Sequence, residues 1–337
     1  MKILNRLILA AGFATMAVLL WKLNASVVWA QISKLGWGFA LILAFQILDH
    51  MLNAMGWRMA FSPEDARGVP FWRLIKGRVA GDGVNYLTPS ATIAGEFVRP
   101  GMLGDAASAE ARNTSVVAAK FAQSLGQPLF IFLGLIFVLN GRLTPLEGHQ
   151  RALAIAAALF VILFLTTVVC VLARAPSQGE RFWQARGKFA AMRALMRRYL
   201  LEHPGRFVLS ILFFAAGYAW GALEVLIACY FMGIAMPLFT ALAVETLSNV
   251  VDILMFMVPA KVGAQEAGKT LIFRALGYPA SQGLAFGFIR HARELVWSSA
   301  GFLMYAWEQK RKNLGAPPPA SPRLPARPLE PADSAKL

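Results

Sequence analysis

The chain has 337 residues, of which 57% are hydrophobic and 15% are charged, and its formal net charge is +15. Soluble domains carry about 25% charged residues, so this composition argues against an ordinary soluble protein. The basic residues lie between and after long apolar segments, which is typical of the cytoplasmic loops of membrane proteins. A nucleic-acid-binding protein would gather them into one basic patch, and we therefore expect no nucleic-acid partner.

Long apolar segments recur along the chain and predict membrane-spanning helices. A span needs about 20 mostly apolar residues, and the stretch from Ala152 to Ala173 contains no charged residue. The other apolar segments cover residues 7–21, 37–57, 115–139, 207–232, 237–258 and 282–307. The sequence thus predicts an all-α, polytopic integral membrane protein.

The first apolar run has two interpretations. Lys2 and Arg6 precede it, as in a cleaved signal peptide. A cleavage site at Ala30 would, however, lie well beyond Trp21 and Lys22, which already interrupt the apolar run. We therefore expect a retained first helix.

Basic clusters set the expected orientation. Lys2 and Arg6 precede the first apolar segment, and Lys310, Arg311 and Lys312 follow the last one. Because cytoplasmic loops are enriched in Lys and Arg, we expect both termini in the cytoplasm of a multi-pass protein of the bacterial inner membrane.

We expect one transmembrane domain over residues 1–308, with a first half (1–173), a basic linker (174–206) and a second half (207–308). The linker has apolar side chains at helical spacing, which predicts that part of it lies along the inner leaflet; a solvated basic loop is the alternative. Residues 309–337 are rich in Pro and poor in large apolar side chains, which predicts a disordered, extended cytoplasmic tail.

Two regions do not fit a simple count of crossings. With the orientation above, residues 69–112 must begin and end in the cytoplasm, and residues 237–278 must begin and end on the opposite side. We interpret each region as a re-entrant helical hairpin. The architecture is then about six full spans plus two re-entrant hairpins, and the alternative is two full crossings in a hairpin region, which gives eight or more spans.

Each of these regions contains the pattern Asp-x6-Pro-x6-Glu. The first copy is Asp82, Pro89 and Glu96, and the second is Asp252, Pro259 and Glu266. Proline cannot continue a helix, so both copies predict a break at membrane depth. Opposite entry sides indicate an inverted-repeat architecture, which places a substrate site near the bilayer midplane. A plain loop at each break is the alternative.

Ionisable residues inside predicted spans are the candidate site. Each costs about 2.5–3.5 kcal/mol at mid-span, so such residues normally face the bundle interior. Arg78, Asp82 and Asn85 share one helix face with spacing i, i+4, i+7, and so do Glu245, Asn249 and Asp252. Five basic residues are expected to hold a lipid phosphate, with the acidic residues as counter-charges: Arg78, Arg99, Lys261, Arg290 and Arg293. Structural ion pairs between helices are the alternative interpretation.

Catalytic and metal-binding motifs are lacking. The four histidines are not at metal-ligand spacing, and no H-E-x-x-H, phosphate-binding loop or G-x-S-x-G motif occurs. Both cysteines, Cys170 and Cys229, lie within apolar segments, which argues against a disulfide or a zinc site. We therefore predict no cofactor, no metal and no catalytic residue, and a transporter is favoured over an enzyme.

Two stretches resemble a known family. The segment GDGVNYLTPSATIAGEFVRPGML and the segment VPAKVGAQE are similar to two elements of the flippase-like membrane domain, which also forms the transmembrane part of lysylphosphatidylglycerol synthases. The resemblance covers about residues 5–308, and the chain is most similar to the hopanoid-biosynthesis-associated branch. The matching positions are Asn85, Pro89, Gly95, Glu96 and Arg99 in the first element and Pro259, Gly263 and Glu266 in the second.

The chain departs from the family pattern at both elements. Ser90 and Ala91 follow the first proline, and Ala260 and Lys261 stand where the second element usually has two glycines. Lys261 adds a charge at the expected hairpin tip, so it puts the usual substrate in doubt. The resemblance implies lipid translocation or the handling of a lipid intermediate, without fixing the lipid.

The favoured hypothesis is an inner-membrane lipid flippase linked to hopanoid or related polyisoprenoid biosynthesis, whose partners are anionic or hopanoid-type membrane lipids. One alternative is an intramembrane lipid-tailoring enzyme that uses paired carboxylates as acid and base. Another is a non-catalytic scaffold that docks other lipid-biosynthesis proteins. The candidate cavity residues are Arg78, Asp82, Asn85, Pro89, Gly95, Glu96, Arg99, Glu245, Asn249, Asp252, Pro259, Lys261, Gly263, Glu266, Arg290, Arg293 and Glu294.

Overall fold

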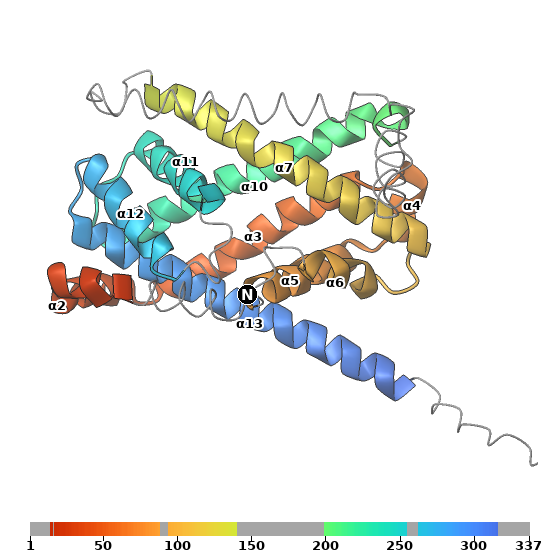
Figure 1. The fold of residues 1–337 in the computed structure, drawn as a ribbon, viewed down its shortest axis with the longest axis horizontal. Coiled ribbons are helices and arrows are strands. Elements are labelled where there is room, and N and C mark those ends of the chain that lie inside the picture. Colours follow the sequence, from red (N-terminus) through yellow and green to blue (C-terminus); the bar gives the residue numbers. More distant parts are fainter. Residues whose placement is uncertain (1–13, 16, 88–93, 140–198, 255–261, 316–337) are drawn as a thin grey trace, which may run out of the picture.

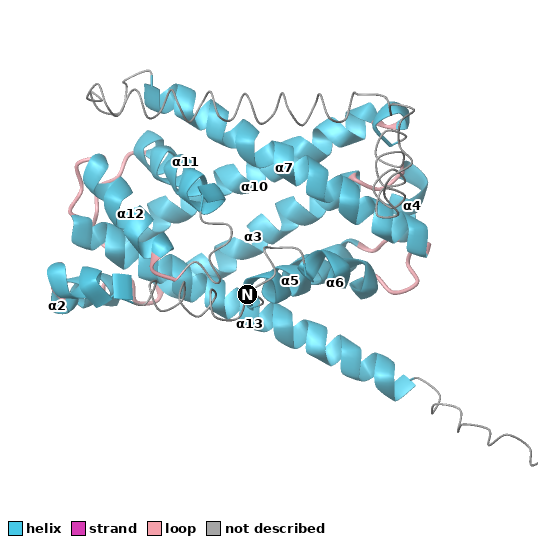
Figure 2. Ribbon diagram, viewed as in Figure 1, coloured by secondary structure: helices cyan, strands magenta, loops and turns pink. Residues whose placement is uncertain are grey.

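The structure is a computed structural model. It describes residues 14–15, 17–87, 94–139, 199–254 and 262–315. Within these ranges every regular element is a helix and no strand occurs (Figures 1 and 2). The all-α prediction is confirmed for this part of the chain.

The structure describes the following helices in chain order. They are α2 (Ala25–Ser33), α3 (Gly38–Met59), α4 (Pro63–Gly68), α5 (Phe71–Leu87), α6 (Ala94–Met102), α7 (Ala109–Leu139), α10 (Pro204–Phe231), α11 (Leu238–Leu254), α12 (Ala264–Ala275) and α13 (Ala280–Gly315). In Figure 1 the long helices α3, α7, α10 and α13 cross the molecule, while α11 and α12 lie to the left and α5 and α6 lie to the right of centre.

Three helices in the described ranges are long and apolar enough to cross a membrane. They are α3, the Ala109–Ile136 part of α7, and α10. By length and composition they match the predicted spans at 37–57, 115–139 and 207–232. Their surfaces expose large apolar side chains, among them Ile47, Leu133 and Leu209. Such exposure suits contact with lipid rather than water.

Three other predicted spans, at 7–21, 152–173 and 282–307, are not among these apolar helices. Residues 282–307 are helical within α13, but this helix falls outside the apolar set because Arg290, Arg293 and Glu294 interrupt its hydrophobic surface. The predicted span at 7–21 lies largely, and that at 152–173 entirely, outside the described residues. The total number of crossings therefore stays a prediction.

Helices α5 and α6 form an antiparallel helical hairpin. At its open end the Arg73 guanidinium donates a hydrogen bond to the Leu103 carbonyl at 2.9 Å. Near its closed end the Gly95 amide donates to Asn85 Oδ1 at 2.6 Å. Residues 88–93, between the two helices in sequence, lie outside the described residues.

Helices α11 and α12 form a second hairpin of the same kind. The Tyr278 hydroxyl donates to the Ala235 carbonyl at 3.2 Å at its open end, and Val251 of α11 lies against Gly268 of α12. Residues 255–261, between these two helices in sequence, also lie outside the described residues. In both hairpins the glutamate of the repeated pattern is the third residue of the second helix as the structure describes it, so the two glutamates occupy equivalent places.

Helix α13 joins the two hairpins by packing against both. The backbone of α12 lies on Gly287, where the α-carbon of Glu266 would be 3.0 Å from an added Cβ. Helix α5 packs on the C-terminal part of α13, where Gly301 lies directly against the Val79 carbonyl. Small residues of this kind allow helix backbones to approach closely.

The two hairpins point toward each other along α13. The open end of the first hairpin lies near the C-terminal end of α13, where Lys76 Nζ is 2.7 Å from Glu308 Oε2. The hydrogen bond from Lys76 lowers the pKa of the Glu308 carboxyl, so this ion pair persists at neutral pH and is lost as acid protonates Glu308. The second hairpin opens beside the N-terminal end of α13. Placement of either hairpin in the bilayer as a re-entrant element stays a prediction.

The end of the basic linker caps α3. Arg206 donates from Nε to the Phe61 carbonyl and from Nη2 to the Arg58 carbonyl, both at 2.9 Å, and the Tyr199 hydroxyl donates to the Met59 carbonyl. The last carbonyls of a helix have no partner within the helix, and basic side chains satisfy them well. The rest of the linker, 174–198, lies outside the described residues, so its position on a leaflet stays a prediction.

The expected boundary of the C-terminal tail differs from the structure. Helix α13 continues to Gly315, past the predicted start of the tail at residue 309. Lys310, Arg311 and Lys312 extend the helix because Lys and Arg have high helix propensity. The predicted disordered part that remains, residues 316–337, lies outside the described residues.

Gly301→Ala tests the close crossing of α5 and α13. The added methyl group would overlap the Val79 carbonyl, and overpacking of this kind typically costs about 1–3 kcal/mol. We expect a lower melting temperature in detergent. The matched control is Gly205→Ala in the first turn of α10, where no atom lies within 4 Å of the new Cβ. Equal melting temperatures for the two variants would contradict the close crossing.

Candidate functional site

The middle of α13 carries a buried charged turn, residues 290–294, which we call the charged turn. Arg290 and Arg293 are each 7% exposed. Successive helical residues point about 100° apart, so neighbouring side chains of this turn reach different helices. Their partners come from α5, α10, α11 and α12.

Arg290 makes a two-pronged ion pair with Glu245 of α11. Its Nη1 and Nη2 donate to the two carboxylate oxygens at 2.5 and 2.8 Å. Asn249, one turn along α11, donates from Nδ2 to Glu245 Oε1 at 2.9 Å. The Glu245 carboxylate lies directly on Gly221 of α10, where any side chain would collide with it. This pair fixes α11 to α13 and requires a glycine in the facing helix.

Arg293 and Glu294 link the same turn to α10 and α12. Arg293 pairs with the buried Glu224 of α10, and its Nη2 is 3.4 Å from Glu294 Oε1. Gln265 of α12 donates to Glu294 Oε1 at 2.9 Å. The Arg293 guanidinium is therefore shared between two carboxylates on different helices.

His291 connects the closed ends of both hairpins. Its Nδ1 is 2.8 Å from Glu266 Oε1, while Glu266 Oε2 accepts from the Gly263 amide at 2.8 Å. Gly263 has a φ of 75°, a backbone conformation that favours glycine. From the first hairpin, the Tyr86 ring lies edge-to-face on the His291 ring with centroids 6.2 Å apart. Tyr86, near the end of α5, and Glu266, near the start of α12, thus both contact the His291 side chain of α13.

A second set of charges, the hairpin ion-pair chain, consists of Arg78, Asp82, Glu96, Arg99 and Lys120. Arg78 Nε is 2.9 Å from Asp82 Oδ2, and Arg99 Nη2 is 2.7 Å from Asp82 Oδ1. Arg99 Nη1 is 2.5 Å from Glu96 Oε2, and Lys120 of α7 is 3.2 Å from Glu96 Oε1. The chain joins α5, α6 and α7, and Arg99 is shared between two carboxylates.

Helix α3 lies between the two charged sets. Asp49 interacts electrostatically with Arg78 of the ion-pair chain and with Arg293 of the charged turn. His50 is 6% exposed, and neither of its ring nitrogens has a hydrogen-bond partner in the structure. Glu224 Oε1 and Gln265 Oε1 are also buried without a partner. Buried polar atoms are normally satisfied by protein or water, so this region is suited to water or a polar ligand.

Most of the sequence-predicted site residues fall into these sets. The ion-pair chain contains Arg78, Asp82, Glu96 and Arg99. The charged turn and its contacts include Glu245, Asn249, Gly263, Glu266, Arg290, Arg293 and Glu294. The Gly95 amide donates a hydrogen bond to the Asn85 side chain. Asp252 lies on α11 and interacts electrostatically with the buried Lys269 of α12. Pro89, Pro259 and Lys261 lie outside the described residues.

The basic residues expected to hold phosphate already have acidic partners. Each of the four that the structure describes is paired with a carboxylate: Arg78, Arg99, Arg290 and Arg293. This arrangement is what the structural ion-pair interpretation predicts. A phosphate would have to compete with a carboxylate at each of these positions.

Sequence reasoning left Glu224, His291, Lys120, Tyr86 and Gln265 out of the candidate set. Lys120 had a visible signal, because it is the lone charged residue of the segment 115–139. Tyr86 and Gln265 had none, since each is a single polar residue whose partner lies far away in sequence. Among the described residues no group of three or more His, Cys, Asp or Glu side chains is placed to hold a metal ion.

A comparison with protein families finds a match over most of the chain. The family model described as the lysylphosphatidylglycerol synthase TM region matches residues 6–300. No curated protein and no solved structure was found to match the chain.

Removing one partner of the Arg290–Glu245 pair tests its structural role. Arg290→Met leaves the Glu245 carboxylate buried without its cation, and breaking a buried pair costs about 3–5 kcal/mol. We expect the double variant Arg290→Met/Glu245→Gln to recover much of this loss, as measured by denaturant unfolding in detergent. If the losses of the two single variants simply add in the double variant, the two residues do not act as a pair.

Proposed function

The chain belongs to the family of the lysylphosphatidylglycerol synthase TM region, a family with a membrane, lipid-related function, and from this membership we propose that it moves a phosphate-bearing lipid between the two leaflets. The observation that carries the proposal is the meeting of two oppositely directed hairpins at the charged turn of α13. Transporters built from inverted repeats bind their substrate where such broken segments converge.

The paired arginines are compatible with a substrate that carries negative charge. Arg99 is shared between Asp82 and Glu96, and Arg293 is shared between Glu224 and Glu294. Either guanidinium can release one carboxylate to a phosphate and keep the other. The planar fork of donors on Arg suits phosphate as well as carboxylate. The carboxylates would then keep the empty site close to neutral.

The unpartnered polar atoms support a wet interior between the hairpins. His50, Glu224 and Gln265 present buried atoms without partners in the region bounded by the charged turn and α3. Non-helical backbone at membrane depth is tolerated only where it is buried in protein or lines an aqueous cavity.

The location of the protein, the class of its lipid substrate and its energy source are part of the same proposal. We place the protein in a bacterial inner membrane with both termini in the cytoplasm, since basic clusters flank the first and last apolar segments. The sequence resemblance to the hopanoid-associated branch favours a hopanoid or polyisoprenoid lipid as the substrate class. The chain contains no phosphate-binding loop motif for ATP, so we expect passive exchange or coupling to protons.

One observation favours a lipid-tailoring enzyme as a second candidate. A carboxylate that holds the Nδ1 atom of a histidine, as Glu266 holds His291 at 2.8 Å, is the arrangement used to orient a general base. This candidate requires purified protein to change the covalent structure of a lipid. Lipid extracts analysed by mass spectrometry before and after incubation distinguish it from translocation.

Glu96→Gln and Glu266→Gln test the proposed translocation. Each substitution keeps the size of the side chain but removes the negative charge that balances Arg99 and Lys120 or pairs with His291. We expect each variant to slow leaflet exchange of a fluorescent phospholipid at least about tenfold, equivalent to roughly 1.4 kcal/mol in the barrier. Exchange is measured in reconstituted vesicles by chemical quenching of the outer leaflet.

The matched control is Glu110→Gln, because Glu110 is an exposed carboxylate in the first turn of α7 and belongs to neither charged set. Its exchange rate should equal that of the unmodified protein, and all three variants should insert in equal amounts. Unchanged exchange in both Glu96→Gln and Glu266→Gln would sink the proposal.

A further inference from the structure

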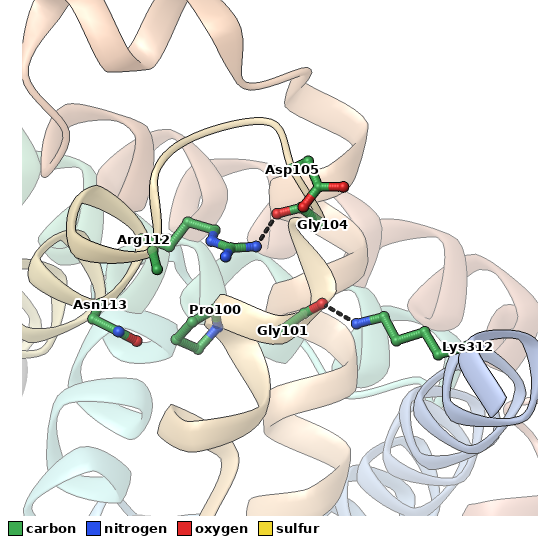
Figure 3. Close-up of a pocket in the computed structure, with 8 residues that line it drawn as sticks. Pro100, Gly101, Gly104, Asp105, Arg112, Asn113 and Lys312 are labelled. Atoms are coloured by element: carbon green, nitrogen blue, oxygen red, sulfur yellow. Dashed lines mark hydrogen bonds between the residues drawn. The ribbon is translucent and has the colours of Figure 1, made fainter. Parts of the chain in front are cut away.

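A pocket lies at the open end of the first hairpin, on the far side of that hairpin from the charged turn. It lies between the C-terminal end of α6, the start of α7 and the last turns of α13, and its volume is about 330 Å³. Arg112, Asn113 and Lys312 bring side-chain donors to it, and Asp105 brings one carboxylate (Figure 3). None of these four residues belongs to the translocation site proposed above.

The two cations of this pocket differ from the buried arginines of the molecule. Arg112 donates to the Gly104 carbonyl, and Lys312 Nζ donates to the Gly101 carbonyl at 2.6 Å (Figure 3). Within the described residues neither forms an ion pair, and Arg112 Nε is buried without any partner. Both cations are thus positioned by neutral backbone groups, and the nearby carboxylates, Asp105 in the lining and Glu308 one turn before Lys312, form no direct ion pair with them. An anion in the pocket would supply the missing counter-charge.

The surroundings of the pocket have the character of a membrane–water interface. Trp72 of α5 and Trp307 of α13 are 59% and 58% exposed. Lys76 Nζ lies 5.1 Å from the centre of the Trp307 ring, and the Arg73 guanidinium lies 5.6 Å from that of Trp72. Exposed Trp beside Lys and Arg is typical of the headgroup level of a bilayer. A lipid headgroup therefore reaches this pocket more readily than a dissolved anion.

We propose that this pocket binds the phosphodiester headgroup of an anionic phospholipid. Arg112 and Lys312 contact the phosphate oxygens, and the Asn113 amide provides a further donor. Because the pocket joins three helices, the bound headgroup ties the C-terminal end of α13 to the open end of the first hairpin. This proposal requires only that the protein is inserted in a membrane, and it does not depend on lipid translocation.

Asp105 limits which anion can bind. It is the one carboxylate among the residues that line the pocket, and it is exposed. With two cations and one carboxylate, the lining has a single excess positive charge, which matches a phosphodiester with one negative charge. A doubly charged phosphomonoester would leave one charge uncompensated beside Asp105.

The binding test uses the full chain in a neutral detergent, titrated with phosphatidylglycerol and with phosphatidylcholine and followed by native mass spectrometry. Each basic residue near a membrane surface contributes about 1 kcal/mol. We expect Arg112→Gln/Lys312→Gln to weaken phosphatidylglycerol binding about 30-fold, which corresponds to about 2 kcal/mol. The charge-matched control Lys310→Gln/Arg311→Gln removes two exposed cations outside the pocket and should change binding less than about threefold.

Three single variants test the pocket further by the same binding titration. If the double variant fails to fold, Lys312→Gln alone, on the exposed end of α13, should weaken binding about fivefold. Asp105→Asn should tighten phosphatidylglycerol binding by about the same factor. Glu64→Gln, at an exposed carboxylate of α4 outside the pocket and outside both charged sets, should leave binding unchanged. The titration measures binding and not leaflet exchange, so a failure of the translocation proposal is distinguishable from a failure of this one.

Several outcomes would overturn the site. One is equal loss of binding in the pocket variant and in its charge-matched control. Another is weaker binding in Asp105→Asn together with a preference for phosphatidylethanolamine, which would mean that Asp105 pairs with a lipid amine. A third is binding of soluble glycerol phosphate as tight as that of phosphatidylglycerol. It would show that the pocket takes a dissolved anion instead of a lipid.

Discussion

The charged turn of α13 is the constraint on which the arrangement of the other helices depends. Charges buried in an apolar interior are unfavourable unless each one has a well-placed partner. Arg290 and Arg293 therefore require Glu245 and Glu224, and His291 is held by Glu266. These partners come from three different helices, so satisfying one turn of α13 fixes α10, α11 and α12 around it. A helix that would otherwise be free to slide or rotate in an apolar bundle is thereby held in register.

The two hairpins share a framework but use it differently. Glu96 and Glu266 are both the third residue of the second helix of their hairpin. Glu266 is tied to its own helix start through Gly263 and to α13 through His291. Glu96 instead forms ion pairs with two cations, Arg99 on its own helix and Lys120 on α7. One copy of the repeat is thus tied to its own helix start and to α13, while the other is tied to its own helix and to α7.

Positive charge plays two distinct roles in this molecule. The arginines in the interior are each neutralised by a carboxylate, which makes them compatible with a low-dielectric environment. Arg112 and Lys312 at the open end of the first hairpin donate to backbone carbonyls and, within the described residues, form no direct ion pair. A charge near the molecular surface tolerates this arrangement because solvent or a bound headgroup can balance it. The same residue types therefore hold helices together in the interior and offer charge to a ligand near the interface.

The sequence by itself determined the helical class, the spans that became α3, α7 and α10, and the two helical breaks with a glutamate after each. These are local properties, because apolar length, proline and helical spacing act within one segment. It did not determine which charges meet: Lys120 with Glu96, Glu224 with Arg293 and Tyr86 with His291 are contacts between distant helices. Nor did it show that α13 continues to Gly315 and closes a pocket over α6 and α7. Only the tertiary structure decided these pairings, because a buried charge selects its partner by the packing of whole helices and not by its neighbours in the chain.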